Sequence, residues 1–216
     1  FLETSGIPAA WTILGLSALP TGHPSNRGMV GMHGNYAPNL LTNECDLLIA
    51  IGMRFDDRVT GDLNTYAKQA KVIHLELDPA EVNKNVKADV TLLCDCKISL
   101  QALNDKISTK TYPEWIKRFD DLDVIEKEKV IYGDLNPTKP GLTMGESVEM
   151  INKHSNGDAV IVTDVGQHQM VACRYAKFTQ SKSNVTSGGL GTMGFALPAA
   201  IGAKMGAPSR EVVAII

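Results

Sequence analysis

Short apolar runs that end in glycine or acidic residues alternate along this chain with segments of helical spacing. The runs at 46–52, 71–78 and 159–166 read "DLLIAIG", "KVIHLELD" and "AVIVTDVG". Nearly continuous apolar runs are typical of strands buried on both faces of a sheet, and the helices between them supply the crossovers that parallel strands need. The sequence therefore predicts an α/β fold, with parallel sheets and flanking helices.

A change of character after residue 103 divides the chain. Trp115, Phe119, Leu122 and Ile125 recur at intervals of three and four, which predicts an amphipathic helix. The stretch "GDLNPTKPGL" that follows is rich in glycine and proline, as linkers are. We therefore expect a partial α/β domain over 1–103 and a helical linker over 104–142.

A second α/β domain is expected over 143–216. Thr143 and Glu146 have the T-x-x-E spacing of a capping box, which indicates a helix start. The chain begins "FLETSG" without methionine and ends "REVVAII" in an expected strand. We therefore expect both domains to be incomplete pieces of a longer protein.

Smaller elements are predicted from local patterns. Residues 9–14 read as a first strand, residues 66–70 as the end of a helix, and Pro79 as the first residue of another helix. Residues 195–206 read as a helix rich in small residues.

Composition excludes several classes of function. The formal net charge of -3 and the mixed charges give no basic stripe, so no nucleic-acid partner is expected. The apolar runs are shorter than the roughly 20 residues that span a bilayer, so no membrane partner is expected. We expect a cytoplasmic protein whose four cysteines are reduced, mostly buried thiols that form neither a disulfide nor a zinc site: Cys45, Cys94, Cys96 and Cys173.

Ligands of open parallel sheets bind at the carboxyl ends of the strands, so the loops there are the candidate sites. Glu76 and Asp78 follow one strand, although Asp78 before proline favours a helix cap over a ligand. His33 lies in the glycine-rich loop 31–38, where a structural histidine is the simpler interpretation. Gln167 and His168 open a helix, where free N–H groups attract phosphate.

The loop "GMRFDDRVTG" at 52–61 carries two arginines and two aspartates directly after an apolar run. These four charges fit a substrate or phosphate site, and they also fit a solvated network of surface ion pairs of little stability. Nothing in the sequence has the spacing of a metal site or of a Ser-His-Asp triad.

The segment "GLGTMG" at 189–194 satisfies the G-x-G-x-x-G pattern of dinucleotide-binding turns. The residues before it, "QSKSNVTS", are polar and cannot form the buried central strand that this motif needs. A nicotinamide dehydrogenase is therefore disfavoured, and the segment is a glycine-rich turn whose ligand the pattern does not define.

Three stretches together resemble the acetolactate synthase family of thiamine-diphosphate enzymes, also called acetohydroxyacid synthases: "GMHGNYAPNLLTNECDLLIAIGMRFDDRVTG", "TDVGQHQM" and "SGGLGTMGFALPAAIGAK". The resemblance runs over essentially the whole chain, as most of the middle domain and the start of the third. It implies FAD on the middle domain and thiamine diphosphate held between domains of two subunits. In that alignment "GLGTMG" holds thiamine diphosphate, with Met193 supporting the bent form of the cofactor.

The resemblance assigns roles to individual positions. Asp57 and Arg58 match the substrate channel, Gln167 and His168 match the diphosphate-binding pair, and Gly191 and Met193 match the stretch against the aminopyrimidine ring. The positions that match FAD contacts are Thr12, Ile13, Leu14, Met32, His33, Gly52, Arg54, Asp56, Val59, Glu76, Leu77, Asp95 and Cys96. The activating glutamate and the motif that binds Mg2+ are expected outside this sequence, so no catalytic residue and no metal ligand are predicted within it.

The implied activity is that of a transferase: one pyruvate loses CO2, and its two-carbon remainder joins a second pyruvate or 2-oxobutyrate. This step belongs to the biosynthesis of the branched-chain amino acids isoleucine, valine and leucine. A homodimer or tetramer with a small regulatory subunit is implied, and the isolated fragment is expected to be inactive. The alternatives are a related carboligase or oxidase, of the glyoxylate carboligase or pyruvate oxidase type, and a non-catalytic nucleotide-binding module.

Overall fold

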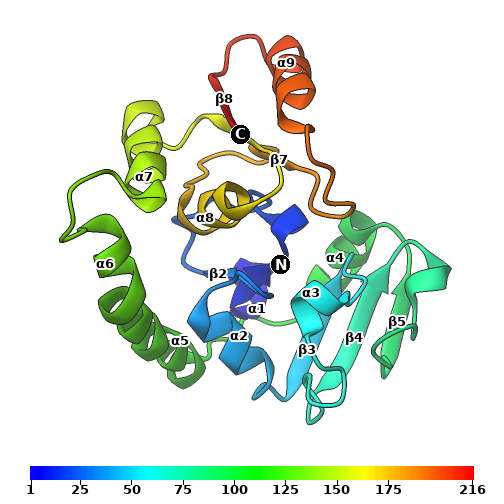
Figure 1. Cartoon of the computed structure of the whole chain (residues 1–216). Helices are drawn as coiled ribbons and strands as arrows, with labels where there is room; N and C mark the ends of the chain where they lie inside the picture. The colour runs from blue at the N-terminus through cyan, green and yellow to red at the C-terminus, as the bar shows by residue number, and fades with distance from the viewer.

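The computed structural model describes residues 1–216 and contains three parallel sheets with helices around them (Figure 1). The α/β prediction is confirmed. A two-stranded sheet pairs β1 with β2, a three-stranded sheet has the order β3-β4-β5, and another has the order β7-β6-β8. The strands are β1 Ala9–Trp11, β2 Asn26–Met29, β3 Leu47–Ile51, β4 Lys71–Glu76, β5 Val90–Leu93, β6 Val160–Thr163, β7 Asn184–Thr186 and β8 Val212–Ile215.

The sheet β3-β4-β5 packs one face against the loops that follow its strands. Phe55 and Tyr66 meet edge to face with ring centroids 6.3 Å apart, over Ala50 of β3 and Val72 of β4. The short helix α3 (Asp57–Thr60) follows β3, and α4 (Cys96–Asn104) follows β5. This packing fixes the loop 52–61 over the carboxyl edge of the sheet.

All four residues of the central strand β6 are buried, because helices cover both faces of its sheet. Ile161 packs with Val148 of α7 (Met144–Ser155) and Ala172 of α8 (Gln167–Tyr175). Val160 and Val162 point the other way, onto α9 (Ala196–Gly206). Successive side chains of a strand face opposite sides, so an unbroken apolar run is what this position requires.

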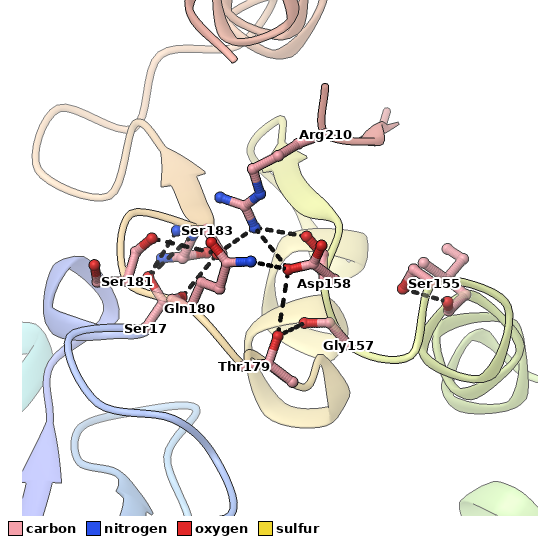
Figure 2. Close-up of polar contacts among 11 residues, drawn as sticks. Ser17, Ser155, Gly157, Asp158, Thr179, Gln180, Ser181, Ser183 and Arg210 are labelled. Atoms are coloured by element: carbon pink, nitrogen blue, oxygen red, sulfur yellow. Dashed lines mark hydrogen bonds and ion pairs between the residues drawn. The ribbon is translucent and has the colours of Figure 1, made fainter. Parts of the chain in front are cut away.

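Four residues tie the amino ends of this sheet together (Figure 2). The Arg210 guanidinium, just before β8, donates to the Asp158 carbonyl at 2.6 Å and to the Ser183 hydroxyl at 2.7 Å. The Gln180 amide donates to the Asp158 carboxylate at 2.5 Å. Asp158 precedes β6 and Ser183 precedes β7, so one polar cluster anchors all three strands at the edge opposite the candidate site.

The predicted linker helix is present and contacts both halves of the chain. Trp115, Phe119 and Leu122 of α5 (Pro113–Glu126) pack on α2 (Tyr36–Thr42). Ile125 does not join them and is 39% exposed, because the apolar stripe turns away from α2 before that position. A π-helical turn, Lys127–Ile131, leads into α6 (Tyr132–Leu135).

The second half of the chain begins as the capping-box pattern predicts. The Thr143 hydroxyl accepts the Glu146 N–H at 3.0 Å, and the Glu146 carboxylate accepts the Thr143 N–H at 2.9 Å. The Tyr175 hydroxyl of α8 donates to the Asp134 carboxylate of α6. These bonds fix the linker against the β6 sheet.

Three local predictions were wrong in part. The strand over 9–14 stops at Trp11, and a 3-10 turn, η1 (Ile13–Gly15), follows. No helix ends at 66–70, because Asp62 directs a turn by accepting the Asn64 N–H at 2.9 Å and Ala67 has a φ of 45°. Pro79 opens only the single turn η2 (Pro79–Glu81). Asn83 then takes a φ of 58°, which ends a helical path.

The remaining short helix is α1 (Leu2–Ser5), which ends at Gly6. The small-residue helix predicted over 195–206 is α9 and is confirmed. Some of the polar residues before the GLGTMG loop form β7, an edge strand of its sheet in this chain, which agrees with the expectation that they do not form a buried central strand.

Candidate cofactor site

The predicted flavin contacts gather at the carboxyl edge of β3-β4-β5. Gly52 directly follows β3, Glu76 ends β4, and Asp95 lies two residues beyond β5. Because these strands are parallel in register, the residues lie along the same edge. Leu77 and Cys96 beside them are exposed.

Three carboxylates among the predicted flavin contacts already accept hydrogen bonds from nearby backbone N–H groups. Asp56 caps α3 by accepting the Arg58 N–H at 3.1 Å, and Asp95 caps α4 by accepting the Lys97 N–H at 2.8 Å. Glu76 accepts the N–H groups of Leu77 and Asp78 through one oxygen, at 2.8 and 3.1 Å. Only Asp95 keeps its second oxygen without a partner, because that of Asp56 lies 3.5 Å from Arg54 Nε and that of Glu76 lies 3.7 Å from His74 Nε2.

Asp78 caps η2 by accepting the Ala80 N–H at 2.9 Å, which confirms the cap interpretation. Arg54 lies 3.5 Å from Asp56, so half of the charged cluster in loop 52–61 is an ion pair. Asp57 and Arg58 are exposed and take part in no such pair.

A cavity of about 310 Å³ opens between the loop after β2 and helix α3. Gly31 allows the loop after β2 to approach α3 closely. Its φ is 107°, and a Cβ there would lie 2.8 Å from the Arg58 carbonyl oxygen. The Met32 N–H donates to the same oxygen at 2.7 Å. His33 is half-buried on this loop and is not among the residues that line the cavity, which are Val30, Gly31, Met32, Asn39, Thr42, Asn43, Asp57, Arg58, Val59, Thr60, Gly61 and Tyr66.

Thr12, Ile13 and Leu14 extend this surface from the end of β1 toward the second half of the chain. The Val30 N–H donates to the Trp11 carbonyl at 2.8 Å, so Thr12 lies next to the loop of Gly31. Leu14 is 60% exposed despite its apolar side chain. The exposed side chains of Leu14, Met32 and Leu77 offer apolar contacts that suit a flat aromatic ring.

Helix α8 presents its amino end at the carboxyl edge of β6. Gly166 precedes it, and no side chain caps the helix. The first-turn N–H groups at Gln167 and His168 can therefore bind an anion. The buried Nε2 of His168 has no partner within the chain, whereas Gln167 is exposed. This donor set fits a diphosphate.

The GLGTMG loop lies beside this helix end, because it follows the neighbouring strand β7. Gly191 has a φ of 65° and donates its N–H to the Ser187 carbonyl at 2.7 Å. Met193 is 79% exposed, so its thioether is free to meet a ligand. The structure therefore brings Gln167, His168, Gly191 and Met193 to one edge.

The sequence analysis missed Asp164, which is the first residue after β6 at this edge. Its carboxylate accepts the Val165 N–H at 2.8 Å and the Gly194 N–H at 2.9 Å. Hydrogen bonding from Val165 is the main cause that lowers the pKa of Asp164, and bonds from Gly194, Ala196 and Phe195 act in the same direction against partial burial. A carboxylate directly after a buried strand, in "TDVG", is the signal that could have identified it.

His74 was also missed, since a histidine inside an apolar strand reads as core. It is fully buried, bonds through Nε2 to the Met53 carbonyl at 2.9 Å, and lies 3.7 Å from Glu76. It therefore joins β4 to the loop of Arg54.

The expectation that most of the thiols are buried was wrong. All four thiols are free, but only Cys173 is buried, and Cys96 is exposed at the start of α4. Nowhere do three or more His, Cys, Asp or Glu side chains gather as metal ligands. Nowhere does the chain form a helix with the length and hydropathy that a bilayer crossing requires.

Comparison with known families fits this geometry. Residues 1–103 match the family described as thiamine pyrophosphate enzyme, central domain, and residues 164–216 match thiamine pyrophosphate enzyme, C-terminal TPP binding domain. The chain therefore belongs to the thiamine pyrophosphate enzymes.

Within that class the chain is similar to acetolactate synthases. It is 41% identical to the acetolactate synthase large subunit of Lactococcus lactis over 100% of this chain and 37% of the relative. It is 40% identical to acetolactate synthase 1, chloroplastic, of Nicotiana tabacum over 100% of this chain and 32% of the relative. The large subunit of Escherichia coli acetolactate synthase isozyme 2 is 41% identical over 100% of this chain and 38% of its own length. The chain thus spans about a third of the length of these relatives.

Proposed function

We propose that this chain is part of an acetolactate synthase, which removes CO2 from one pyruvate and joins the remaining two carbons to a second pyruvate or to 2-oxobutyrate. The observation that carries the proposal is identity of about 40% to acetolactate synthase large subunits across essentially the whole chain. The role is a step in branched-chain amino-acid biosynthesis.

The arrangement of the two edges supports two cofactors. Thiamine diphosphate, which supplies the carbanion-stabilising chemistry when bound, fits the uncapped start of α8 and the adjacent loop. Gln167 and His168 hold its diphosphate, while Gly191 and Met193 face its aminopyrimidine ring. The unpartnered Nε2 of His168 supports this assignment.

FAD fits the edge formed by the ends of β1, β3, β4 and β5. Exposed Leu14, Met32 and Leu77 contact its apolar parts, and Glu76 and Asp95 accept from its hydroxyl groups. Gly52 and Gly31 allow close approach of the backbone. The flavin is structural, because the net reaction transfers no electrons. The other proposed contacts are Thr12, Ile13, His33, Arg54, Asp56, Val59 and Cys96.

Asp57 and Arg58 line the mouth of the substrate channel. Both side chains are exposed and border the cavity beside Gly31. A guanidinium can bind the carboxylate of pyruvate through two parallel hydrogen bonds, which gives Arg58 a role in substrate binding.

Mg2+ does not fit a site built from this chain alone, because no three His, Cys, Asp or Glu side chains gather as ligands. The proposed metal ligands and activating glutamate are residues outside this sequence. The domain division into 1–103, 104–142 and 143–216 is supported by the family matches and by the linker helix.

The proposed assembly is a homodimer or tetramer with a small regulatory subunit, in the cytoplasm. Exposed Leu197, Ile201 and Met205 recur every four residues on α9, which supports burial of that helix in a larger assembly.

The test is a product assay on the complete protein that carries this sequence, supplied with pyruvate, thiamine diphosphate, Mg2+ and FAD. We expect acetolactate, and loss of activity when thiamine diphosphate and Mg2+ are removed. Acetyl phosphate as the product would instead identify a pyruvate oxidase, and carboligation of glyoxylate would identify a glyoxylate carboligase. The isolated chain of 216 residues is expected to be inactive.

A further inference from the structure

The proposed flavin segment and the proposed thiamine loop touch each other directly. Gly188 lies against η1 so closely that a Cβ there would meet Ile13 Cγ2 at 2.8 Å and Leu14 Cδ2 at 3.1 Å. Residue 188 is one position before the GLGTMG loop. A shift of η1 is therefore transmitted to the start of that loop by van der Waals contact.

Hydrogen bonds hold the same two segments together. The Asn184 side chain donates from Nδ2 to the Ile13 carbonyl at 2.9 Å. The Ser17 hydroxyl oxygen accepts the N–H groups of Ser183 and Asn184 at 3.0 and 3.2 Å. Figure 2 shows Ser17 beside Ser183. One end of each bond belongs to the first half of the chain, and the other belongs to Asn184 of β7 or to Ser183 just before it.

This contact is shielded from water. Ser17 is 4% exposed, and Ser183 is fully buried. Ser17 has a φ of 67°, a conformation that a non-glycine residue adopts only when its surroundings hold it there. Buried polar groups that lose a partner are costly, so these bonds restrict η1 and β7 to one relative position.

β7 is also held at its last residue, where the Thr186 hydroxyl accepts from the Thr163 hydroxyl at 2.8 Å and from the Gln169 amide at 2.7 Å. It has three residues and pairs only with β6 in this chain. The bonds of Ser17 and Asn184 fix the start of β7, and Gly188, two residues beyond the strand, is held against Ile13 of η1.

We propose that Ser17 and Asn184 are positioning residues that couple the two cofactor sites, so that flavin bound at Thr12–Leu14 orders the loop that binds thiamine diphosphate. This inference rests on the proposed function. Coupling between binding sites is reciprocal, so each cofactor must raise the affinity for the other by the same factor.

The experiment measures binding to the complete protein. The dissociation constant of FAD is obtained from flavin fluorescence with and without thiamine diphosphate and Mg2+, and that of thiamine diphosphate by calorimetry with and without FAD. We expect the two ratios to agree, at about 5-fold or more. Ser17→Ala and Asn184→Ala are expected to bring both ratios to about 1.

Arg210→Gln is the matched control. It removes a hydrogen bond to Ser183 from the opposite side and leaves the contact with η1 in place. The melting temperature should fall in this variant while the coupling ratio stays that of the wild type. A loss of coupling in Arg210→Gln equal to that in Asn184→Ala would show a general structural effect and overturn the inference.

The binding measurements distinguish a failure of the coupling, of the residue assignment and of the proposed function. A wild-type protein that binds both cofactors independently contradicts the coupling and leaves the proposed function intact. Coupling that persists in both Ser17→Ala and Asn184→Ala contradicts the assignment of these residues. A wild-type protein that binds neither cofactor contradicts the proposed function and this inference together.

Discussion

Both carboxylate oxygens of Asp164 accept the backbone N–H of Gly194, at 2.9 and 3.0 Å. This bond links the end of a fully buried strand to the last glycine of the GLGTMG loop. The loop is exposed over most of its length, so this connection and the bonds to Ser187 restrain it. The proposed thiamine site thus depends on a residue that touches no part of the ligand in our assignment.

The Asp164→Asn substitution should make the free energy of unfolding less sensitive to acid. The pKa of Asp164 is lowered in the folded protein, chiefly by the Val165 N–H. Its contribution to stability is therefore present above the unfolded pKa of about 3.9 and is lost as pH falls through the lower folded value. We expect the free energy of unfolding to fall less below about pH 4 in the variant than in the wild type.

Urea titrations at several pH values test this expectation. Asp105→Asn, at an exposed residue that ends α4, serves as the control. Identical acid profiles for wild type and Asp164→Asn would contradict the prediction.

Gly31→Ala should disturb the cavity beside Arg58. The new Cβ would lie 2.8 Å from a backbone oxygen, and the φ of 107° is unfavourable for alanine. We expect a loss of stability of roughly 1–3 kcal/mol and weaker FAD binding. Gly22→Ala is the matched control, because its Cβ would enter open space. Equal melting temperatures and FAD affinities for the two variants would refute the steric argument.

Arg174→Ala should destabilise the contact between α8 and the linker helix. Arg174 donates to the Glu126 carboxylate, whose side chain is 5% exposed, and to the Gly34 carbonyl at 3.3 Å. Removing the guanidinium leaves a buried carboxylate unpaired, so we expect a loss of about 2–3 kcal/mol.

The double variant Glu126→Gln, Arg174→Ala should recover part of that loss, since it leaves no unpaired charge. Denaturant unfolding of the two single variants and the double variant gives the interaction energy of the pair. Additive losses would mean that the pair does not interact.

Thr143→Ala should cost about 1 kcal/mol, because it removes the hydroxyl that caps α7. The matched control is Thr109→Ala, at an exposed residue outside any helix or strand. Chemical denaturation followed by circular dichroism measures both. A change below the experimental error for Thr143→Ala would argue against the capping box.

The thiols should differ in reactivity. Burial raises the pKa of Cys173 to about 12, so its nucleophilic thiolate is scarce at neutral pH. Cys96 is exposed. Iodoacetamide at about pH 8, near the usual thiol pKa, should modify Cys96 first and Cys173 only after denaturation. Mass spectrometry of the peptides identifies the order, and early modification of Cys173 in the native protein would contradict its burial.

The sequence predicted the features that depend on periodicity and local capping. The apolar run of β6 and the spacing of Thr143 and Glu146 each specify one conformation, and both predictions are confirmed. The helix expected from Pro79 failed because Asn83 adopts a positive φ that composition does not reveal.

The candidate site was predicted one loop at a time. Strand order in parallel sheets places loops at a common edge, so the gathering of Gly52, Glu76 and Asp95 follows from the fold class. The contact of Gly188 with Ile13 joins residues that are remote in sequence, and no local pattern indicates it. Site roles taken from the family resemblance stay predictions until cofactor binding is measured.

The polar cluster of Asp158, Ser183 and Arg210 has a consequence for protein engineering. It secures the three strands at the end away from the proposed ligand, using hydrogen bonds that no loop of the site shares. Loops at the other end can then be lengthened or exchanged without releasing the strands. Libraries confined to residues 165–168 and 188–194, which carry the proposed thiamine diphosphate contacts, would therefore sample altered cofactor affinity on an intact scaffold.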